Sequence, residues 1–333
     1  MEYDILMLAY PVVDIIIEMA GKFPIEGDTA RIAKTITPQP GGSGSILITA
    51  SRMGSAILPA GPVSDDYYGQ FLIDSFRKEG IDTGEMVLTQ GYPMSQALCI
   101  VDDGGCHSML SNFSRGEFAF RTGIEPLLSK SLSFYLSAYY LYPEDNNLAS
   151  LSLETVRLLR GLGKPLFFDT SPVIGRICPS VLDEVIELSD VLTMNGAEME
   201  MLTGTSDLDA SARILKNKTD ALIIIKFGAR GCFVTSNKVD GKWYPGFDVK
   251  LVDTTGCGDS FIGAFMHAYM KGFNLDTCVV LANAVGAVMA SKFGTGFQVP
   301  TFDEVVSLLE KNGYSVPSVN KRQRRFVDID FSV

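Results

Sequence analysis

The stretch DTTGCGDSF at residues 253–261, which continues as GAFMHAYM, carries the most information about the fold of this chain. A turn of small residues runs directly into a helical segment. Its glycines let backbone N–H groups point at one spot, and the positive end of the helix dipole adds to them. Such a spot suits the stabilisation of charge on a transferring phosphoryl group. Asp259 is well placed there to accept a proton from an attacking hydroxyl, although spacing alone also allows an ordinary Asp N-cap.

The composition is that of a soluble globular protein. The 333 residues suffice for one large domain or two ordinary ones. Hydrophobic residues make up 46% and charged residues 20%, which excludes disordered and collagen-like chains. With 28 basic and 39 acidic residues the net charge is −11, so we expect neither nucleic acid nor a membrane as partner. The basic run KRQRR at 321–325 is interpreted as a solvated extension, with a binding role as the alternative.

Cysteine usage and hydropathy predict a cytoplasmic protein. None of the six cysteines forms a C-x-x-C pair, and a chain of this size does not depend on disulfides, so we expect reduced thiols. The first residues lack the basic start of a secretory signal. The longest uncharged runs are too short for a membrane span and contain Pro, Gly or Asn.

Short apolar runs alternate with helix-length segments over most of the chain. This alternation predicts βαβ units and a three-layer α/β fold, with a mainly parallel sheet that is buried on both faces. The expected strands are residues 5–9, 57–60, 134–137, 166–169, 191–193 and 222–227. The expected helices are residues 45–52, 67–78, 148–162, 181–188, 210–216, 260–270, 275–291 and 303–311.

Two stretches interrupt this alternation. Residues 15–19 with 29–36, and residues 95–101 with 107–111, have the pattern of short antiparallel strands. The second pair is joined by the turn-rich DDGGC at 102–106. We expect these strands to form a small sheet that projects from the main domain.

The turn at 253–259 resembles the C-terminal signature of the ribokinase, or PfkB, family of carbohydrate kinases. The usual pattern is D-T-x-G-A-G-D, and six of its seven positions match, with Cys257 where Ala is commonest. The resemblance covers roughly residues 4–304. It implies a ribokinase-like α/β/α fold with a β-sheet lid, and an ATP-dependent kinase with Asp259 as the general base. The N–H groups of Gly256, Cys257 and Gly258 would form the anion hole.

The resemblance also implies a domain organisation and a set of ligands. The kinase domain would span residues 1–313, with lid strands contributed by about 14–36 and 95–111, and residues 314–333 would form a C-terminal extension. The implied cofactors are ATP and Mg²⁺, with K⁺ as an option. The acceptor would be a sugar, a sugar acid or a nucleoside, and a homodimer could form through the lid.

A second motif is NGAE at residues 195–198, which follows an apolar strand and opens a helix. Asn195 and Glu198 then share an exposed first helical turn, and the simplest interpretation is a variant of the capping box. The N-x-x-E motif of the family is similar, and there it organises Mg²⁺ through water molecules. Oxygen ligands with few direct carboxylates agree with the preference of Mg²⁺ for its hydration shell.

Two further segments resemble parts of the family's nucleotide site. Lys226, Gly228 and Gly231 belong to the run KFGARG, which resembles the strand and G-x-x-G turn that lie against the nucleotide; a plain hairpin is the alternative. Asn283 lies in an otherwise apolar helix, where a lone amide needs a partner. In the family this helix borders the adenine pocket, and a buried structural role is equally compatible with the sequence.

The N-terminal part resembles the family's first signature, in which an Asp and a Gly-Gly turn bind sugar hydroxyls. Asp14 follows an apolar strand, and Gly41, Gly42 and Ser43 precede a helix. Glycine lets the backbone approach a ring, and a carboxylate accepts hydrogen bonds from vicinal hydroxyls. Where the family usually has Asn, this chain has Ser45, or Ile46 if a one-residue gap is allowed. The identity of the acceptor therefore cannot be inferred from the commonest sugar kinases of the family.

Three side chains of the 253–259 turn have alternative interpretations. Asp253 and Thr255 could place a monovalent cation, as in some relatives, or Asp253 could simply cap the turn. The thiol of Cys257 could have a lowered pKa at the helix N-terminus, or it could fill the place of Ala as a small, partly buried side chain.

Two other protein classes were considered. A non-catalytic sugar or nucleoside sensor of the same fold is the alternative to the kinase, but a sensor has no physical need for an unpaired carboxylate in an anion hole. A nicotinamide-dependent oxidoreductase is disfavoured, since no G-x-G-x-x-G follows the first expected strand.

Overall fold

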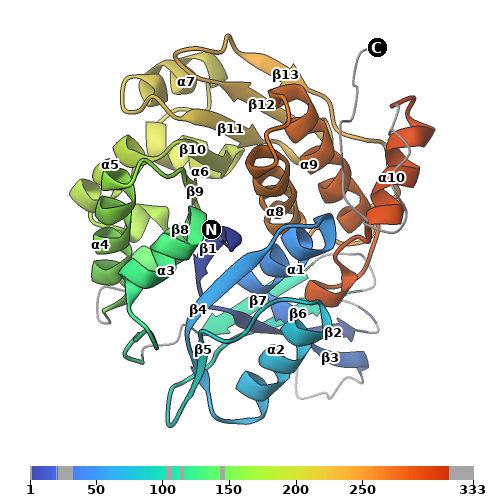
Figure 1. The fold of residues 1–333 in the computed structure, drawn as a ribbon. Coiled ribbons are helices and arrows are strands. Elements are labelled where there is room, and N and C mark those ends of the chain that lie inside the picture. Colours follow the sequence, from blue (N-terminus) through green and yellow to red (C-terminus); the bar gives the residue numbers. More distant parts are fainter. Residues whose placement is uncertain are drawn as a thin grey trace.

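Parallel pairing dominates the larger of two β-sheets in the computed structural model, which describes residues 2–19, 21, 33–102, 107–112, 116–142 and 147–314 (Figure 1). Its nine strands have the order β13-β12-β11-β10-β9-β8-β1-β4-β5, and only the β11–β12 and β12–β13 pairs are antiparallel. The strands are β1 (Tyr3–Leu8), β4 (Ile57–Ser64), β5 (Met86–Thr89), β8 (Ser131–Ser137), β9 (Leu166–Asp169), β10 (Val191–Asn195), β11 (Leu222–Lys226), β12 (Cys232–Thr235) and β13 (Lys242–Tyr244).

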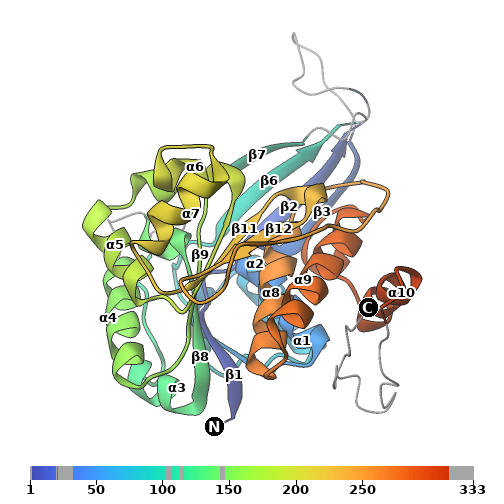
Figure 2. The same ribbon diagram turned by 90° about the horizontal axis from the view of Figure 1, so that it is seen from above.

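Helices cover both faces of this sheet, which gives the predicted three layers (Figure 2). One layer contains α3 (Ile124–Lys130), α4 (Leu148–Gly161), α5 (Pro179–Leu188), α6 (Gly196–Thr203) and α7 (Leu208–Lys216). The other contains α1 (Ser43–Met53), α2 (Tyr67–Lys78), α8 (Cys257–Met270), α9 (Leu275–Ala290) and α10 (Phe302–Lys311), with α8 packed between α1 and α9.

The central strands are buried on both faces, as expected for a parallel sheet between two helical layers. Leu6 in β1, Phe167 in β9 and Ile224 in β11 have no exposed surface. All six strands that we predicted for this sheet are confirmed; the strand at 166–169 has the predicted ends, and the other five have shifted ends. The strands β5, β12 and β13 were not predicted, because they are short and two of them form an edge hairpin with partly exposed side chains.

The small sheet has the order β3-β2-β6-β7 and projects from the main body (Figure 2). Its strands are β2 (Val12–Met19), β3 (Ala33–Gly41), β6 (Ser95–Val101) and β7 (His107–Asn112). The two predicted antiparallel pairs are confirmed, and β2 and β6 join them by parallel pairing. The strand expected at 29–36 lies further along the chain, at Ala33–Gly41.

Several predictions fall outside the described residues. These are the start of the 29–36 strand, most of the DDGGC turn, the KRQRR run and nearly all of the extension at 314–333. The boundary of the kinase domain at residue 313 stays a prediction. Among the described helices, none has both the length and the apolar character that crossing a membrane requires.

Side chains at helix starts explain where several helices begin. The carboxylate of Asp66 accepts hydrogen bonds from the backbone N–H groups of Tyr68 and Gly69 at the start of α2. Thr301 and Glu304 form a capping box at the start of α10. Each cap satisfies N–H groups that have no partner within the helix, and a cap of this kind contributes about 1 kcal/mol.

We predict that Gly69→Ala destabilises the protein. A Cβ atom at Gly69 would lie 1.8 Å from the backbone oxygen of Ser64, so β4 or α2 must move. The free energy of unfolding should fall by about 1–3 kcal/mol, the usual cost of overpacking. Gly161→Ala is the matched control, since open space surrounds Gly161 at the end of α4 and Ala gains roughly 0.5–1 kcal/mol in a helix. Urea denaturation measures both, and equal stability of the two variants would contradict the packing seen here.

Candidate active site

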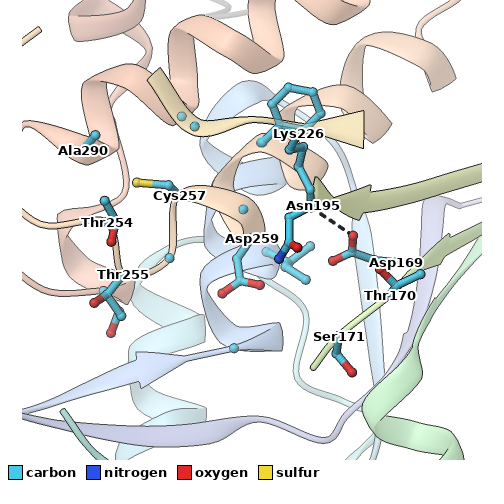
Figure 3. Close-up of a pocket in the computed structure, with 18 of the residues that line it drawn as sticks. Asp169, Thr170, Ser171, Asn195, Lys226, Thr254, Thr255, Cys257, Asp259 and Ala290 are labelled. Atoms are coloured by element: carbon cyan, nitrogen blue, oxygen red, sulfur yellow. Dashed lines mark hydrogen bonds and ion pairs between the residues drawn. The ribbon is translucent and has the colours of Figure 1, made fainter. Parts of the chain in front are cut away.

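A cavity of about 840 Å³ lies at the carboxyl ends of the parallel strands, between the small sheet and the start of α8 (Figure 3). This position is where open α/β sheets usually bind ligands, and the volume is typical of small-molecule sites. The small sheet contributes Val12, Asp14, Ala97, Met109 and Ser111 to the wall.

Asp259 lies in the first turn of α8 and faces the cavity (Figure 3). Gly256 is the N-cap with a φ of +73°, and no side chain caps the helix, while the N–H of Cys257 donates to the carbonyl of Thr254 at 3.3 Å. Burial, together with the charge of Asp169, raises the pKa of Asp259 to about 7, and the charge of Lys226 opposes this increase. The structure thus brings together the predicted turn, a carboxylate and a helix N-terminus.

The residues predicted to bind the phosphoryl acceptor lie either at the cavity wall or directly behind it. Asp14, Gly42 and Ser43 line it. Gly41 lies behind Asp14, and a Cβ atom there would be 2.0 Å from the carboxylate carbon, so only glycine fits. Burial raises the pKa of Asp14 to about 7.

Ser45, which we predicted to contact the acceptor, is not among the residues that line the cavity. It is fully buried, and its hydroxyl donates to the carbonyl of Pro40 at 3.3 Å and accepts from the N–H of Gly296 at 3.1 Å. Ser45 therefore joins the end of β3 to the 3-10 turn that begins at Gly296. Ile46, the alternative allowed by a one-residue gap, does line the cavity.

Asn195 and Glu198 both line the cavity and form a complete capping box at the start of α6. The expectation that both are exposed is wrong for Glu198, which is buried because its carboxylate accepts from the N–H of Asn195 at 2.9 Å and from the hydroxyl of Thr170 at 2.7 Å. The capping and ligand-binding interpretations are compatible here. Amide, hydroxyl and carboxylate oxygens are also a donor set that suits a hydrated Mg²⁺.

Lys226, Gly228, Gly231 and Asn283 all line the cavity, on the side formed by β11 and α9. The G-x-x-G run also forms the hairpin that was the alternative interpretation, since β11 and β12 pair across it. The amide of Asn283 lies 3.5 Å from the carbonyl of Tyr244 and is buried at the cavity wall, which agrees with the structural interpretation. A role beside adenine stays a prediction.

Asp253 caps its own turn. One carboxylate oxygen accepts from the N–H of Thr255 at 2.9 Å and from its hydroxyl at 2.7 Å, and the other accepts from the N–H of Gly294 at 3.1 Å. These contacts agree with the capping alternative. A monovalent cation at Asp253 and Thr255 stays a prediction.

The run Asp169-Thr170-Ser171, which begins at the last residue of β9, lines the cavity and was not predicted as part of the site (Figure 3). Within the described residues the buried hydroxyl oxygen of Ser171 has no hydrogen-bond partner, and such a group needs one from a ligand or water. A signal for this run exists, because three polar residues directly follow the apolar strand LFF. The carboxyl end of that strand meets the same sheet edge as Asn195 and Lys226.

Comparisons with known proteins agree with this geometry. Over 305 residues, the chain is 25% identical to fructokinase-1 of Zea mays, covering 86% of this chain and 93% of the relative. It is 27% identical to a ribokinase of Haemophilus influenzae, covering 81% and 87% respectively. The fold matches Arabidopsis thaliana ribokinase, solved with ribose and ATP, with a TM-score of 0.76 at 18% identity, covering 93% of this chain and 99% of that one.

The fold is that of the ribokinases and related kinases among the solved structures, with a mainly parallel α/β/α body and a second, smaller sheet beside the cavity. The family model described as pfkB family carbohydrate kinase matches residues 7–302. The chain belongs to this family, and it is an ATP-dependent kinase of the carbohydrate and nucleoside type.

We predict that the thiol of Cys257 is unreactive at neutral pH. Burial, aided by the charges of Asp253 and Asp259, raises its pKa to about 12, which argues against the activated-thiolate alternative. Cys178 is exposed at the start of α5. Iodoacetamide at pH 7.5 should therefore label Cys178 before Cys257, as peptide mass mapping will show. Faster labelling of Cys257 in a Cys178→Ser variant than in the denatured chain would contradict this.

Proposed function

We propose that this kinase transfers the γ-phosphoryl group of ATP to a hydroxymethyl group of a sugar, sugar acid or nucleoside, with Asp259 as the general base. One observation carries the proposal: Asp259 lies at the uncapped N-terminus of α8, faces the cavity and has a pKa raised to about 7. A base with such a pKa can accept a proton near neutral pH and release it afterwards.

The acceptor would bind at the end of the cavity formed by Asp14, Gly42 and Ser43. The Asp14 carboxylate would accept hydrogen bonds from its hydroxyls, which orients the hydroxymethyl group towards Asp259. During transfer a bond forms between the acceptor oxygen and the γ-phosphorus, and the bond from that phosphorus to the bridging oxygen of ADP breaks. The acceptor proton passes to Asp259. The N–H groups of Gly256, Cys257 and Gly258 would stabilise the charge on the phosphoryl oxygens.

The nucleotide would lie along Lys226, Gly228 and Gly231, with Asn283 beside the adenine. Asn195 and Glu198 would hold Mg²⁺ through water, and when bound the ion would neutralise charge on the phosphates. A role for K⁺ at Asp253, and a homodimer through the small sheet, also stay predictions.

The names of related proteins support this range of acceptors. Relatives are named fructokinase, nucleoside kinase and 5-dehydro-2-deoxygluconokinase, and one solved structure with the same fold holds ribose and ATP. The alternative, a non-catalytic sensor, is disfavoured because Asp259, Asn195 and Glu198 line one cavity. A sensor would need none of the three in this arrangement.

Phosphoryl transfer to a panel of ketoses, pentoses, sugar acids and nucleosides tests the proposal. With Mg·ATP, mass spectrometry should detect a singly phosphorylated product from at least one acceptor. Asp259→Asn keeps the size of the side chain but cannot take the proton, so kcat should fall by roughly 10²–10⁴-fold while nucleotide affinity changes little. Acceptor binding without any product would favour the sensor, and near-normal turnover of the variant would exclude Asp259 as the base.

We expect the activity to fall on acidification below about pH 7. Asp259 must be ionised to accept a proton, and its raised pKa of about 7 means that it becomes protonated as the pH falls through that value. Asp14 has a pKa of about 7 as well, and its ionised form is the better acceptor for hydroxyls. The acidic limb of log kcat/KM against pH should therefore have a slope between one and two. Asp14→Asn should reduce it to one, whereas a flat profile from pH 5 to 8 would contradict both assignments.

A further inference from the structure

Lys226 and Asp169 form an ion pair across three strands at the carboxyl edge of the large sheet (Figure 3). The strand registers set Asp169 of β9 opposite Thr193 of β10, and Asn195 of β10 opposite Lys226 of β11. Lys226 thus reaches across β10 to the carboxylate. One oxygen of Asp169 accepts from the Lys226 ammonium at 3.1 Å and also from the hydroxyl of Thr193.

The ammonium of Lys226 lies beside the start of α8. A Cβ atom at Gly258 would be 3.6 Å from Nζ, and the ring centroid of Phe261 is 6.0 Å away. The Lys226 charge and the N–H groups at the start of α8 are therefore directed at the same part of the cavity. Both act in the same sense on an anion, because both are positive.

Lys226 is the only basic side chain among the described residues that line the cavity, whereas five acidic residues line it. Burial lowers the pKa of Lys226, but the charges of Asp169, Glu198 and Asp259 outweigh it and the pKa is raised, so the group stays an ammonium. An ammonium has three N–H donors. Within the described residues one of them reaches Asp169, which leaves two for a ligand.

A purely structural role does not account for this pair. Burying two charges is costly, and replacing a buried pair by apolar residues is often neutral or stabilising. The two side chains are 16% and 10% exposed, and both line the cavity. An anionic nucleotide next to five carboxyl groups needs a cation, and a flexible lysine chain needs a partner that holds it in place.

We propose that Asp169 is a positioning residue, which holds the Lys226 ammonium beside the start of α8 so that it contacts the γ-phosphoryl group during transfer. This inference rests on the proposed function and adds a second positive group to the backbone N–H groups. Asp169 itself does not contact the phosphoryl group. Its effect on the reaction passes through Lys226.

A double-mutant cycle tests this route of action, with Asp169→Asn, Lys226→Met and the double variant. Asn keeps the shape of Asp169 and can still accept from Thr193. Each single variant should lower kcat by roughly 10- to 100-fold, the range for losing a charged hydrogen bond, while KM for the acceptor stays within about twofold. In the Lys226→Met background, Asp169→Asn should change kcat by less than about threefold. If the fall in kcat of the double variant equals the product of the falls in the two single variants, the proposal is overturned. Asp169 would then have a role of its own, such as metal binding.

Nucleotide binding gives a readout that does not depend on turnover. By calorimetry, Asp169→Asn should weaken binding of a non-hydrolysable ATP analogue by roughly tenfold relative to ADP, because only the analogue has a γ-phosphoryl group. An unchanged ratio of the two affinities would overturn the inference even if kcat falls. If the wild-type chain transfers no phosphoryl group to any acceptor, the proposed function fails, and this ratio still decides the role of Asp169.

Two controls keep the test specific. Glu184→Gln breaks a surface ion pair in which Nε of Arg157 lies 2.6 Å from Oε1 of Glu184. This variant should leave kcat and both nucleotide affinities unchanged. Lys226→Arg keeps the positive charge and should retain at least tenfold more activity than Lys226→Met when Asp169 is present. If the Asp169→Asn variant does not fold, as judged by its thermal transition, the comparison of Lys226→Arg with Lys226→Met replaces the double-mutant cycle. Equal activity of the Arg and Met variants would then overturn the proposal.

Discussion

The free N-terminus of α8 is the feature on which the rest of the site depends. Gly256 turns the chain with a positive φ, and no side chain caps the helix, although the N–H of Cys257 donates to the carbonyl of Thr254 at 3.3 Å. The helix is held there by close packing, because a Cβ atom at Gly263 would lie 2.9 Å from the carbonyl oxygen of Ile46 in α1. This contact fixes the start of α8 beside the carboxyl edge of the large sheet. The proposed role of Asp259 as a base depends on this position of the helix.

Charge balance is the second constraint, and segments that are far apart in the sequence provide it. Asp14 comes from the small sheet, whereas Asp169 and Lys226 end the strands β9 and β11 of the large sheet. Glu198 lies in the first turn of α6, which follows β10. Carboxyl groups bind hydroxyls and metal-bound water, but they repel the phosphates of a nucleotide. One lysine and the N–H groups of a helix offset this repulsion. The pKa values of Asp14 and Asp259, both raised to about 7, are a consequence of the same crowding and burial.

Buried strands could be predicted from the sequence, whereas edge strands and the directions of some side chains could not. The buried parallel strands were found because their apolar runs are long and continuous, whereas the short edge strands β5, β12 and β13 lack this pattern. Ser45 was misplaced because the sequence does not show whether its hydroxyl faces the cavity or the backbone at Gly296. Glu198 was expected to be exposed, because its sequence neighbours do not reveal its contact with Thr170. That contact forms only when β9 and β10 lie side by side.

The sequence alone determined the α/β class, the family resemblance and the glycine-rich turn at residues 253–259 that leads into a helix. These features depend on local conformation: glycine permits a positive φ, and a helix that follows directly sets the direction of its own N–H groups. Tertiary structure alone decided that Asp169 pairs with Lys226, and that Asp14 packs against Gly41. Such contacts depend on strand order, register and the direction of each side chain. Two residues separated by 57 positions become neighbours only when the sheet places their strand ends at one edge.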